Sequence, residues 1–233
     1  DAYLSVAEAM SHAGYTLNTH IKIHWIDSET LTEANYKDAL SSLDGIIVPG
    51  GFGGRGIEGM ILAAKFARET GLPYFGICLG LQIAVIEYAR NVAGIKDAHS
   101  GEFDELCKNK VIDFIPGQSE DVDKGGTLRL GAYPCVIKAG TTMEKCYGKD
   151  LISERHRHRY EFNNDYRETL ENAGLTLSGR SPDGRLIETV EISDRPFYVG
   201  VQFHPEFKSR PNKAHPLFRG FIAAALDAAE GKR

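Results

Sequence analysis

The stretch PYFGICLGLQIAVIEYA, residues 73–89, decides the fold, because it passes from an apolar strand through a glycine turn into an apolar helix. The residues before Cys78 predict a buried parallel strand, and residues 81–89 predict the helix that follows. Gly76 and Gly80 flank the cysteine in the pattern G-x-C-x-G. A sharp strand-to-helix turn of this kind exposes a nucleophile in serine hydrolases. The pattern therefore predicts a reactive thiol at Cys78.

The segments upstream of this stretch alternate in the same way. Residues 45–48 form a short apolar run that ends in glycines, and residues 57–71 place apolar side chains on one helical face. Residues 3–14 and 32–40 predict two more helices, and residues 20–26 alternate as a strand. This order predicts an α/β fold with a doubly wound, mostly parallel sheet, whose site lies at the carboxyl ends of the strands.

Beyond residue 125 the pattern changes to short strands and turns, which predict an additional small antiparallel layer. The expected strands cover residues 127–130, 135–138, 152–162, 175–178, 186–192 and 197–203. Residues 117–125 predict a mobile surface loop. The chain opens with a helix, whereas a doubly wound domain normally begins with a central strand. We therefore expect one domain, residues 1–233, from which a leading central strand is absent.

Composition narrows the class of partner. The chain has 233 residues, 42% of them hydrophobic, and a net charge of -5. That balance favours one domain with a small-molecule substrate over a partner that is nucleic acid or membrane. The sequence shows neither a long apolar stretch nor a signal-peptide pattern, which favours a cytoplasmic location. The four cysteines are far apart and lack C-x-x-C spacing, so neither a disulfide scaffold nor a metal site is indicated. The cysteines are Cys78, Cys107, Cys135 and Cys146.

A nucleophilic cysteine needs a base, and the segment VQFHPE, residues 201–206, supplies one. In an extended segment, side chains two residues apart point to the same face. The carboxylate of Glu206 can therefore reach one ring nitrogen of His204 while the other nitrogen faces Cys78. A His-Pro-Glu sequence alone is weak evidence for a catalytic site. Together with the turn at Cys78, it predicts a Cys-His-Glu triad.

Three motifs resemble the signatures of class I glutamine amidotransferases and occur in the same order. They are P-G-G-F-G at 49–53, G-I-C-L-G-x-Q at 76–82 and Q-F-H-P-E at 202–206. This resemblance implies a nucleophile, a general acid/base and an orienting carboxylate. These roles fall on Cys78, His204 and Glu206.

Further stretches resemble the CTP synthases, so that the similarity covers essentially the whole chain. They are residues 50–59, 84–92, 125–133, 154–164 and 204–211. The resemblance implies a C-terminal domain that hydrolyses L-glutamine to glutamate and ammonia. The ammonia would pass to an N-terminal synthetase domain, absent here, that aminates UTP with ATP. No cofactor is implied for this domain, whereas ATP, Mg²⁺ and allosteric GTP are implied for a homotetrameric full-length enzyme.

The resemblance also assigns the substrate pocket. Free glutamine carries an ammonium and a carboxylate, so its pocket needs an acidic group, a basic group and a carbonyl. The resemblance places these groups on Glu102 and Arg159, helped by Gln82 and the backbone at Tyr160. It further implies an oxyanion hole and a lid that responds to GTP. The oxyanion hole would be formed by Gly51 and Leu79, and the lid by Phe52 and Arg55.

Residues 155–159, with the sequence RHRHR, have other readings. A nucleic-acid patch would stand isolated in an acidic protein, and a His-x-His metal pair would lack further ligands. If the run is a strand, the arginines share one face and the histidines the other. For the whole chain, the alternatives are another class I amidotransferase, a γ-glutamyl hydrolase, or a non-catalytic scaffold.

Overall fold

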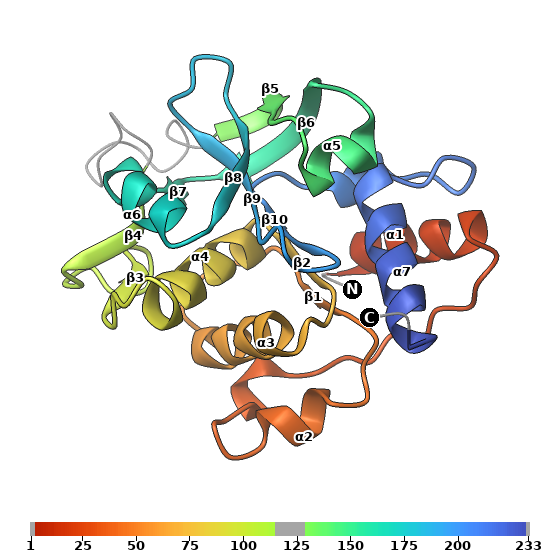
Figure 1. Ribbon diagram of the computed structural model, residues 1–233, viewed down its shortest axis with the longest axis horizontal. Helices are drawn as coiled ribbons and strands as arrows, with labels where there is room; N and C mark the ends of the chain where they lie inside the picture. Colours follow the sequence, from red (N-terminus) through yellow and green to blue (C-terminus); the bar gives the residue numbers. More distant parts are fainter. Residues whose placement is uncertain (1–2, 115–128, 232–233) are drawn as a thin grey trace.

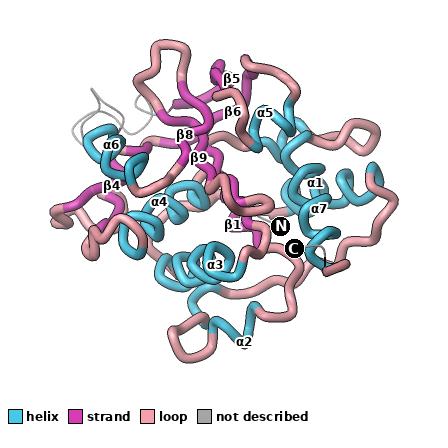
Figure 2. The backbone as a smooth tube through the Cα atoms, in the orientation of Figure 1, coloured by secondary structure: helices cyan, strands magenta, loops and turns pink. Residues whose placement is uncertain are grey.

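The computed structural model describes residues 3–114 and 129–231, which form an α/β fold around a seven-stranded mixed sheet (Figures 1 and 2). The strand order is β1-β2-β10-β9-β8-β5-β6. The strands are β1 (Ile46–Val48), β2 (Tyr74–Ile77), β5 (Arg129–Ile137), β6 (Leu151–His158), β8 (Thr176–Arg180), β9 (Ile187–Glu191) and β10 (Tyr198–Val201). Within this sheet, β2 pairs in parallel with β1 and β10, and the other described pairs are antiparallel.

A second, three-stranded sheet is present, as expected, but two of its strands precede residue 125 and pair in parallel. It consists of β3 (Ala98–Ser100), β4 (Asn109–Phe114) and β7 (Tyr160–Phe162). Most of the antiparallel strands expected after residue 125 instead continue the main sheet. The α/β class is therefore confirmed, and the main sheet is parallel only around β2, where the cysteine turn begins.

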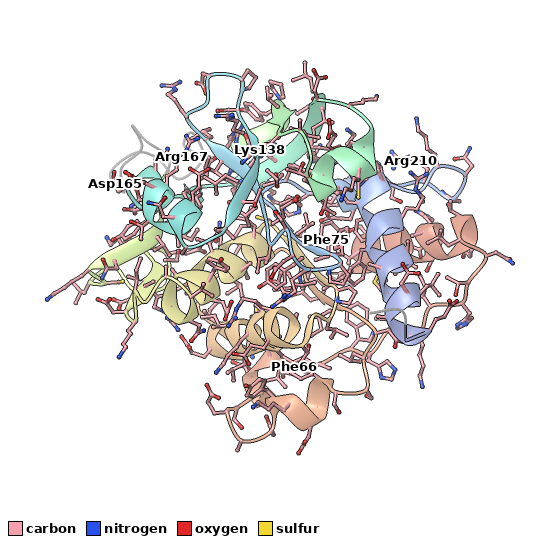
Figure 3. The ribbon with its side chains drawn as sticks, in the orientation of Figure 1. Phe66, Phe75, Lys138, Asp165, Arg167 and Arg210 are labelled. Atoms are coloured by element: carbon pink, nitrogen blue, oxygen red, sulfur yellow. The ribbon has the colours of Figure 1, made fainter. Side chains whose placement is uncertain are left out.

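Helices cover both faces of the main sheet, with α3 and α4 on one side and α1 and α7 on the other (Figure 1). The helices are α1 (Leu4–Thr16), α2 (Tyr36–Leu40), α3 (Ile57–Thr70), α4 (Leu79–Asn91), α5 (Thr142–Tyr147), α6 (Arg167–Asn172) and α7 (Pro216–Ala229). Because strand side chains alternate, Tyr74 joins the α3/α4 core and Phe75 the opposite one. Phe75, which is labelled in Figure 3, packs against Phe218 of α7 with ring centroids 5.2 Å apart.

Several local expectations differ from the structure. Residues 20–26 form no regular secondary structure and join no sheet in the described part of the chain, so the predicted strand there is wrong. They instead line a cavity of about 500 Å³ together with residues of β1 and α7. Residues 152–162 divide into β6 and β7, which belong to different sheets. The loop expected at 117–125 lies outside the described residues, and the absence of a leading strand stays a prediction.

Candidate active site

Cys78 lies in a strained turn between β2 and α4. Its φ of 50° and ψ of -96° place a non-glycine residue in a sparsely populated region, a feature often found at functional sites. A Cβ atom added to Gly76 would lie 2.5 Å from the carbonyl group of Gly80, and one added to Gly80 would overlap the carbonyl oxygen of Val48. The backbone N–H of Cys78 donates to the carbonyl of Val201 at 2.7 Å. Close backbone packing therefore holds the turn in place.

His204 lies beside Cys78 because β10 runs parallel to β2 and ends at the same edge of the sheet. A Cβ atom added to Gly50 would lie 2.7 Å from Cε1 of His204 and 3.6 Å from Cβ of Cys78, so both side chains border the same point. Nδ1 of His204 lies 2.8 Å from Oε1 of Glu206. The structure thus brings the three expected triad residues together.

Two opposing effects act on the imidazole of His204. Burial lowers its pKa, but interactions with Cys78 and Glu206 outweigh burial and raise the pKa to about 10. Among the described residues, Nε2 has no partner that meets hydrogen-bond geometry. Because Glu206 holds Nδ1, Nε2 is the nitrogen left for proton transfer, and the interaction with Cys78 shows that the ring lies near the thiol.

The expected oxyanion donors, Gly51 and Leu79, lie next to each other beside the strand-to-helix turn at Cys78, here called the elbow. A Cβ atom added to Gly51 would lie 3.0 Å from Cδ2 of Leu79. Leu79 is the first residue of α4, and first-turn N–H groups have no acceptor within their own helix. The positive end of the helix dipole also lies here, where it favours an anion. The location suits a developing negative charge.

The expected substrate residues form two neighbouring pairs. Oε1 of Glu102 accepts a hydrogen bond from the N–H of Gly53 at 3.1 Å. Burial raises the pKa of Glu102, against the lowering effects of that hydrogen bond and of the charge on Arg159, which therefore lies close by. Nε2 of the buried Gln82 donates to the carbonyl of Tyr160 at 2.9 Å. One amide hydrogen of Gln82 is thus already engaged by the protein.

The two expected lid residues lie on the surface. The Phe52 side chain is 70% exposed. The guanidinium of Arg55 pairs with the carboxylate of Glu29 at 3.0 Å and 2.7 Å, and hydrogen bonding to Arg55 lowers the pKa of Glu29. The structure therefore places Phe52 and Arg55 on an open loop and gives Arg55 an intramolecular partner.

Sequence reasoning missed one buried side chain of the site, Gln202, although it quoted the motif that contains it. Nε2 of Gln202 lies 3.6 Å from Sγ of Cys78. The detectable signal was the two-residue spacing from His204, since residues two apart in an extended segment share a face.

A buried ionic cluster was also missed. On β6 the histidines are buried and the arginines exposed, as the alternation predicts. Arg129 bridges two buried carboxylates, with contacts of 3.2 Å to Glu161 and 2.6 Å to Glu188. Nε2 of His158 lies 2.6 Å from Oε1 of Glu161. Burial raises the pKa of Glu188 to about 7, although Arg129 opposes this. The two histidines of the RHRHR run therefore face this buried cluster.

This arrangement is compatible with cysteine-dependent chemistry, and the chain belongs to the class I glutamine amidotransferase family. A model of that family, described as Glutamine amidotransferase class-I, matches residues 1–224. The chain is similar to CTP synthases over nearly all of its length. It is 60% identical to the CTP synthase of Carboxydothermus hydrogenoformans over 97% of the chain, and 54% identical to that of Bacillus subtilis over 100%. It spans 42% and 43% of the length of these two relatives.

A solved structure gives the same result. The glutaminase domain of Trypanosoma brucei CTPS, with bound acivicin, superposes with a TM-score of 0.91 at 41% identity, covering 97% of this chain and 89% of that one. The resemblance to class I amidotransferases and to CTP synthases is therefore confirmed. No helix in the described part of the chain is both long and apolar enough to cross a membrane. The expected cytoplasmic location stays a prediction.

Proposed function

We propose that the chain hydrolyses L-glutamine to glutamate and ammonia, with Cys78 as nucleophile, His204 as general acid/base and Glu206 as its orienting group. The observation that carries the proposal is the strained position of Cys78 beside an imidazole whose Nδ1 lies 2.8 Å from Glu206. A structural cysteine has no need of such a backbone or such a neighbour.

The reaction follows from these positions. Sγ of Cys78 attacks the side-chain amide carbon of glutamine, and the N–H groups of Gly51 and Leu79 stabilise the oxyanion by about 3 kcal/mol each. The C–N bond breaks as His204 gives its proton to the departing nitrogen, which leaves as ammonia and a γ-glutamyl thioester. Water then loses a proton to His204 and attacks the thioester. The C–S bond breaks, and glutamate and the thiolate are released.

Glutamine recognition rests on the pocket beside the triad. We assign its α-ammonium to Glu102 and its α-carboxylate to Arg159. The carbonyl of Tyr160 and the amide of Gln82 complete the pocket. The carboxylate and guanidinium lie close enough to influence each other, which suits a substrate that carries both charges on one carbon.

The similarity to CTP synthases supports a wider role. The ammonia would pass to an N-terminal synthetase domain that converts UTP to CTP with ATP and Mg²⁺ in a homotetramer. The metal–nucleotide would bind to that synthetase domain. GTP would act through Phe52 and Arg55, an exposed ring and a guanidinium of the kinds that contact bases and phosphates.

Replacement of the nucleophile tests the proposal. Cys78→Ser should abolish ammonia release from glutamine, because the thioester no longer forms at a useful rate. The matched control is Cys146→Ser, since burial raises the pKa of that thiol to about 11 and keeps it unreactive. In the full-length enzyme, Cys78→Ser should still support UTP amination by added ammonia. Near-normal glutamine hydrolysis by Cys78→Ser would overturn the assignment.

A further inference from the structure

The side-chain amide of Gln202 is buried beside the sulfur of Cys78. It follows β10 directly, its side chain is fully buried, and its backbone N–H donates to the carbonyl of Glu188 at 2.8 Å. This backbone bond fixes the residue against the start of β9. From there, Nε2 lies 3.6 Å from Sγ of Cys78, within hydrogen-bond range for a sulfur acceptor.

The orientation of this amide follows from its other neighbour. Nε2 of Gln82 donates to the carbonyl of Tyr160 at 2.9 Å, and a carbonyl only accepts, so that atom of Gln82 must be nitrogen. The same nitrogen lies 3.5 Å from the amide of Gln202 and must therefore face its oxygen. The NH₂ group of Gln202 is left to face Cys78. The sulfur of Cys78 is therefore positioned to accept a hydrogen bond from this NH₂ group.

We infer that Gln202 is a further catalytic residue of this site, whose amide donates a hydrogen bond to the Cys78 thiolate. The inference rests on the proposed cysteine chemistry. A hydrogen bond to the charged form of a group favours that form. It therefore increases the fraction of reactive thiolate, and it stabilises the same thiolate when the C–S bond of the thioester breaks. Gln82 acts through Gln202 as a positioning residue.

A hydrogen bond to a charged group is strong enough that its loss should change the pH dependence of thiol labelling measurably. Hydrogen bonds to ions contribute roughly 1.5–3 kcal/mol, which corresponds to about one to two pH units. Gln202→Met keeps a similar volume and removes the donor. The rate at which iodoacetamide labels Cys78 is measured by peptide mass spectrometry as a function of pH. In Gln202→Met the midpoint of this rate profile should lie at least about one pH unit higher than in the unaltered chain. At high pH the two labelling rates should converge.

Three further variants separate this role from general damage. Gln202→Glu is nearly isosteric and puts an acceptor beside the sulfur, so it should raise the midpoint too, and it carries the test if Gln202→Met does not fold. Gln82→Leu leaves the donor but frees its orientation, so its shift should be smaller. Ser178→Ala removes a buried 2.8 Å hydrogen bond to Thr189 and should leave the midpoint unchanged.

The outcomes distinguish this inference from the proposed function. An unchanged midpoint in folded Gln202→Met or Gln202→Glu overturns the inference, whatever the glutaminase activity. If the unaltered chain labels normally but releases no ammonia from glutamine, the proposed function fails while the hydrogen bond stands. An equal shift in Ser178→Ala would also overturn the inference, because a general loss of packing would then explain it.

Discussion

Two glycine-rich turns meet at the active site, and their glycines are there for different reasons. At the elbow, a Cβ atom on Gly76 or Gly80 would collide with backbone carbonyl groups. On the neighbouring loop, a Cβ atom added to Gly53 or Gly54 would meet nothing within 4 Å. Close packing requires the elbow glycines. At Gly53 a positive φ favours glycine, and at Gly54 neither packing nor backbone conformation requires it.

This difference suggests that the two turns have different functions in the site. The elbow holds Cys78 in a rigid position, which suits a group that must be aimed before substrate arrives. The loop carries Phe52 and Arg55 on the surface and is tied to the pocket through the bond from Gly53 to Glu102. If the comparison is right, substitutions at the elbow should damage fold and chemistry together, and substitutions on the loop should not.

The largest effect is expected at the elbow. Gly80→Ala gains about 1 kcal/mol of helix propensity, but its methyl group would overlap the carbonyl oxygen of Val48 in β1. Overpacking against backbone should dominate, and we expect the free energy of unfolding to fall by about 3 kcal/mol or more, with loss of glutamine hydrolysis. Urea unfolding monitored by circular dichroism measures this. A stability equal to that of the unaltered chain would contradict the packing argument.

A large catalytic effect with an intact fold is expected at Glu206. Glu206→Gln should lower glutamine turnover by roughly 100-fold or more, because His204 loses the carboxylate that orients it. The charge on His204 stabilises the fold fully below pH 6.5, and this contribution is lost as the pH rises through about 10. Cys78 and Glu206 both raise this pKa, and Glu206→Gln removes only the contribution of Glu206. The difference in unfolding free energy between the two proteins should therefore be largest at and below pH 6.5 and shrink toward pH 10. A difference independent of pH would exclude this linkage.

The elbow was predictable from the sequence because its signals are local. G-x-C-x-G after an apolar run specifies strand, turn and helix within a few residues. The contact between His204 and Glu206 was expected from an extended segment, but Pro205–Lys208 form a 3-10 helix, and the short separation along the chain still brings the two side chains together. Residues 20–26 show the limit of such local signals. An alternating pattern resembles that of a strand, but it does not specify a neighbouring strand with which the segment could pair. Gln202 and the Arg129 cluster were missed because their contacts join segments far apart in the chain. The pairing of Arg55 with Glu29 was missed for the same reason.

The pocket should show an intermediate effect. Glu102→Ala and Arg159→Ala should each lower kcat/KM about 10- to 150-fold, because each removes a charge-assisted hydrogen bond to glutamine. Iodoacetamide, which lacks an amino-acid head, should label Cys78 at near-normal rates in both variants. Glutamine-like chloroketones should label it more slowly, by a factor similar to the loss in kcat/KM. Equal slowing with both reagents would mean that these residues shape the thiol's surroundings instead.

The smallest effect is expected at Gly54 on the loop. Gly54 is exposed, does not have a positive φ, and offers open space to a methyl group, so Gly54→Ala should introduce no clash. Alanine reduces the freedom of the unfolded chain, and the substitution should therefore leave stability unchanged or raise it by up to about 1 kcal/mol. Glutamine hydrolysis by the chain should stay near normal, since Gly54 does not contribute a donor to the oxyanion. The same urea and ammonia-release measurements serve as a matched control for Gly80→Ala. A loss of stability comparable to that of Gly80→Ala would show that the loop is as tightly constrained as the elbow, and the comparison between the two turns would fail.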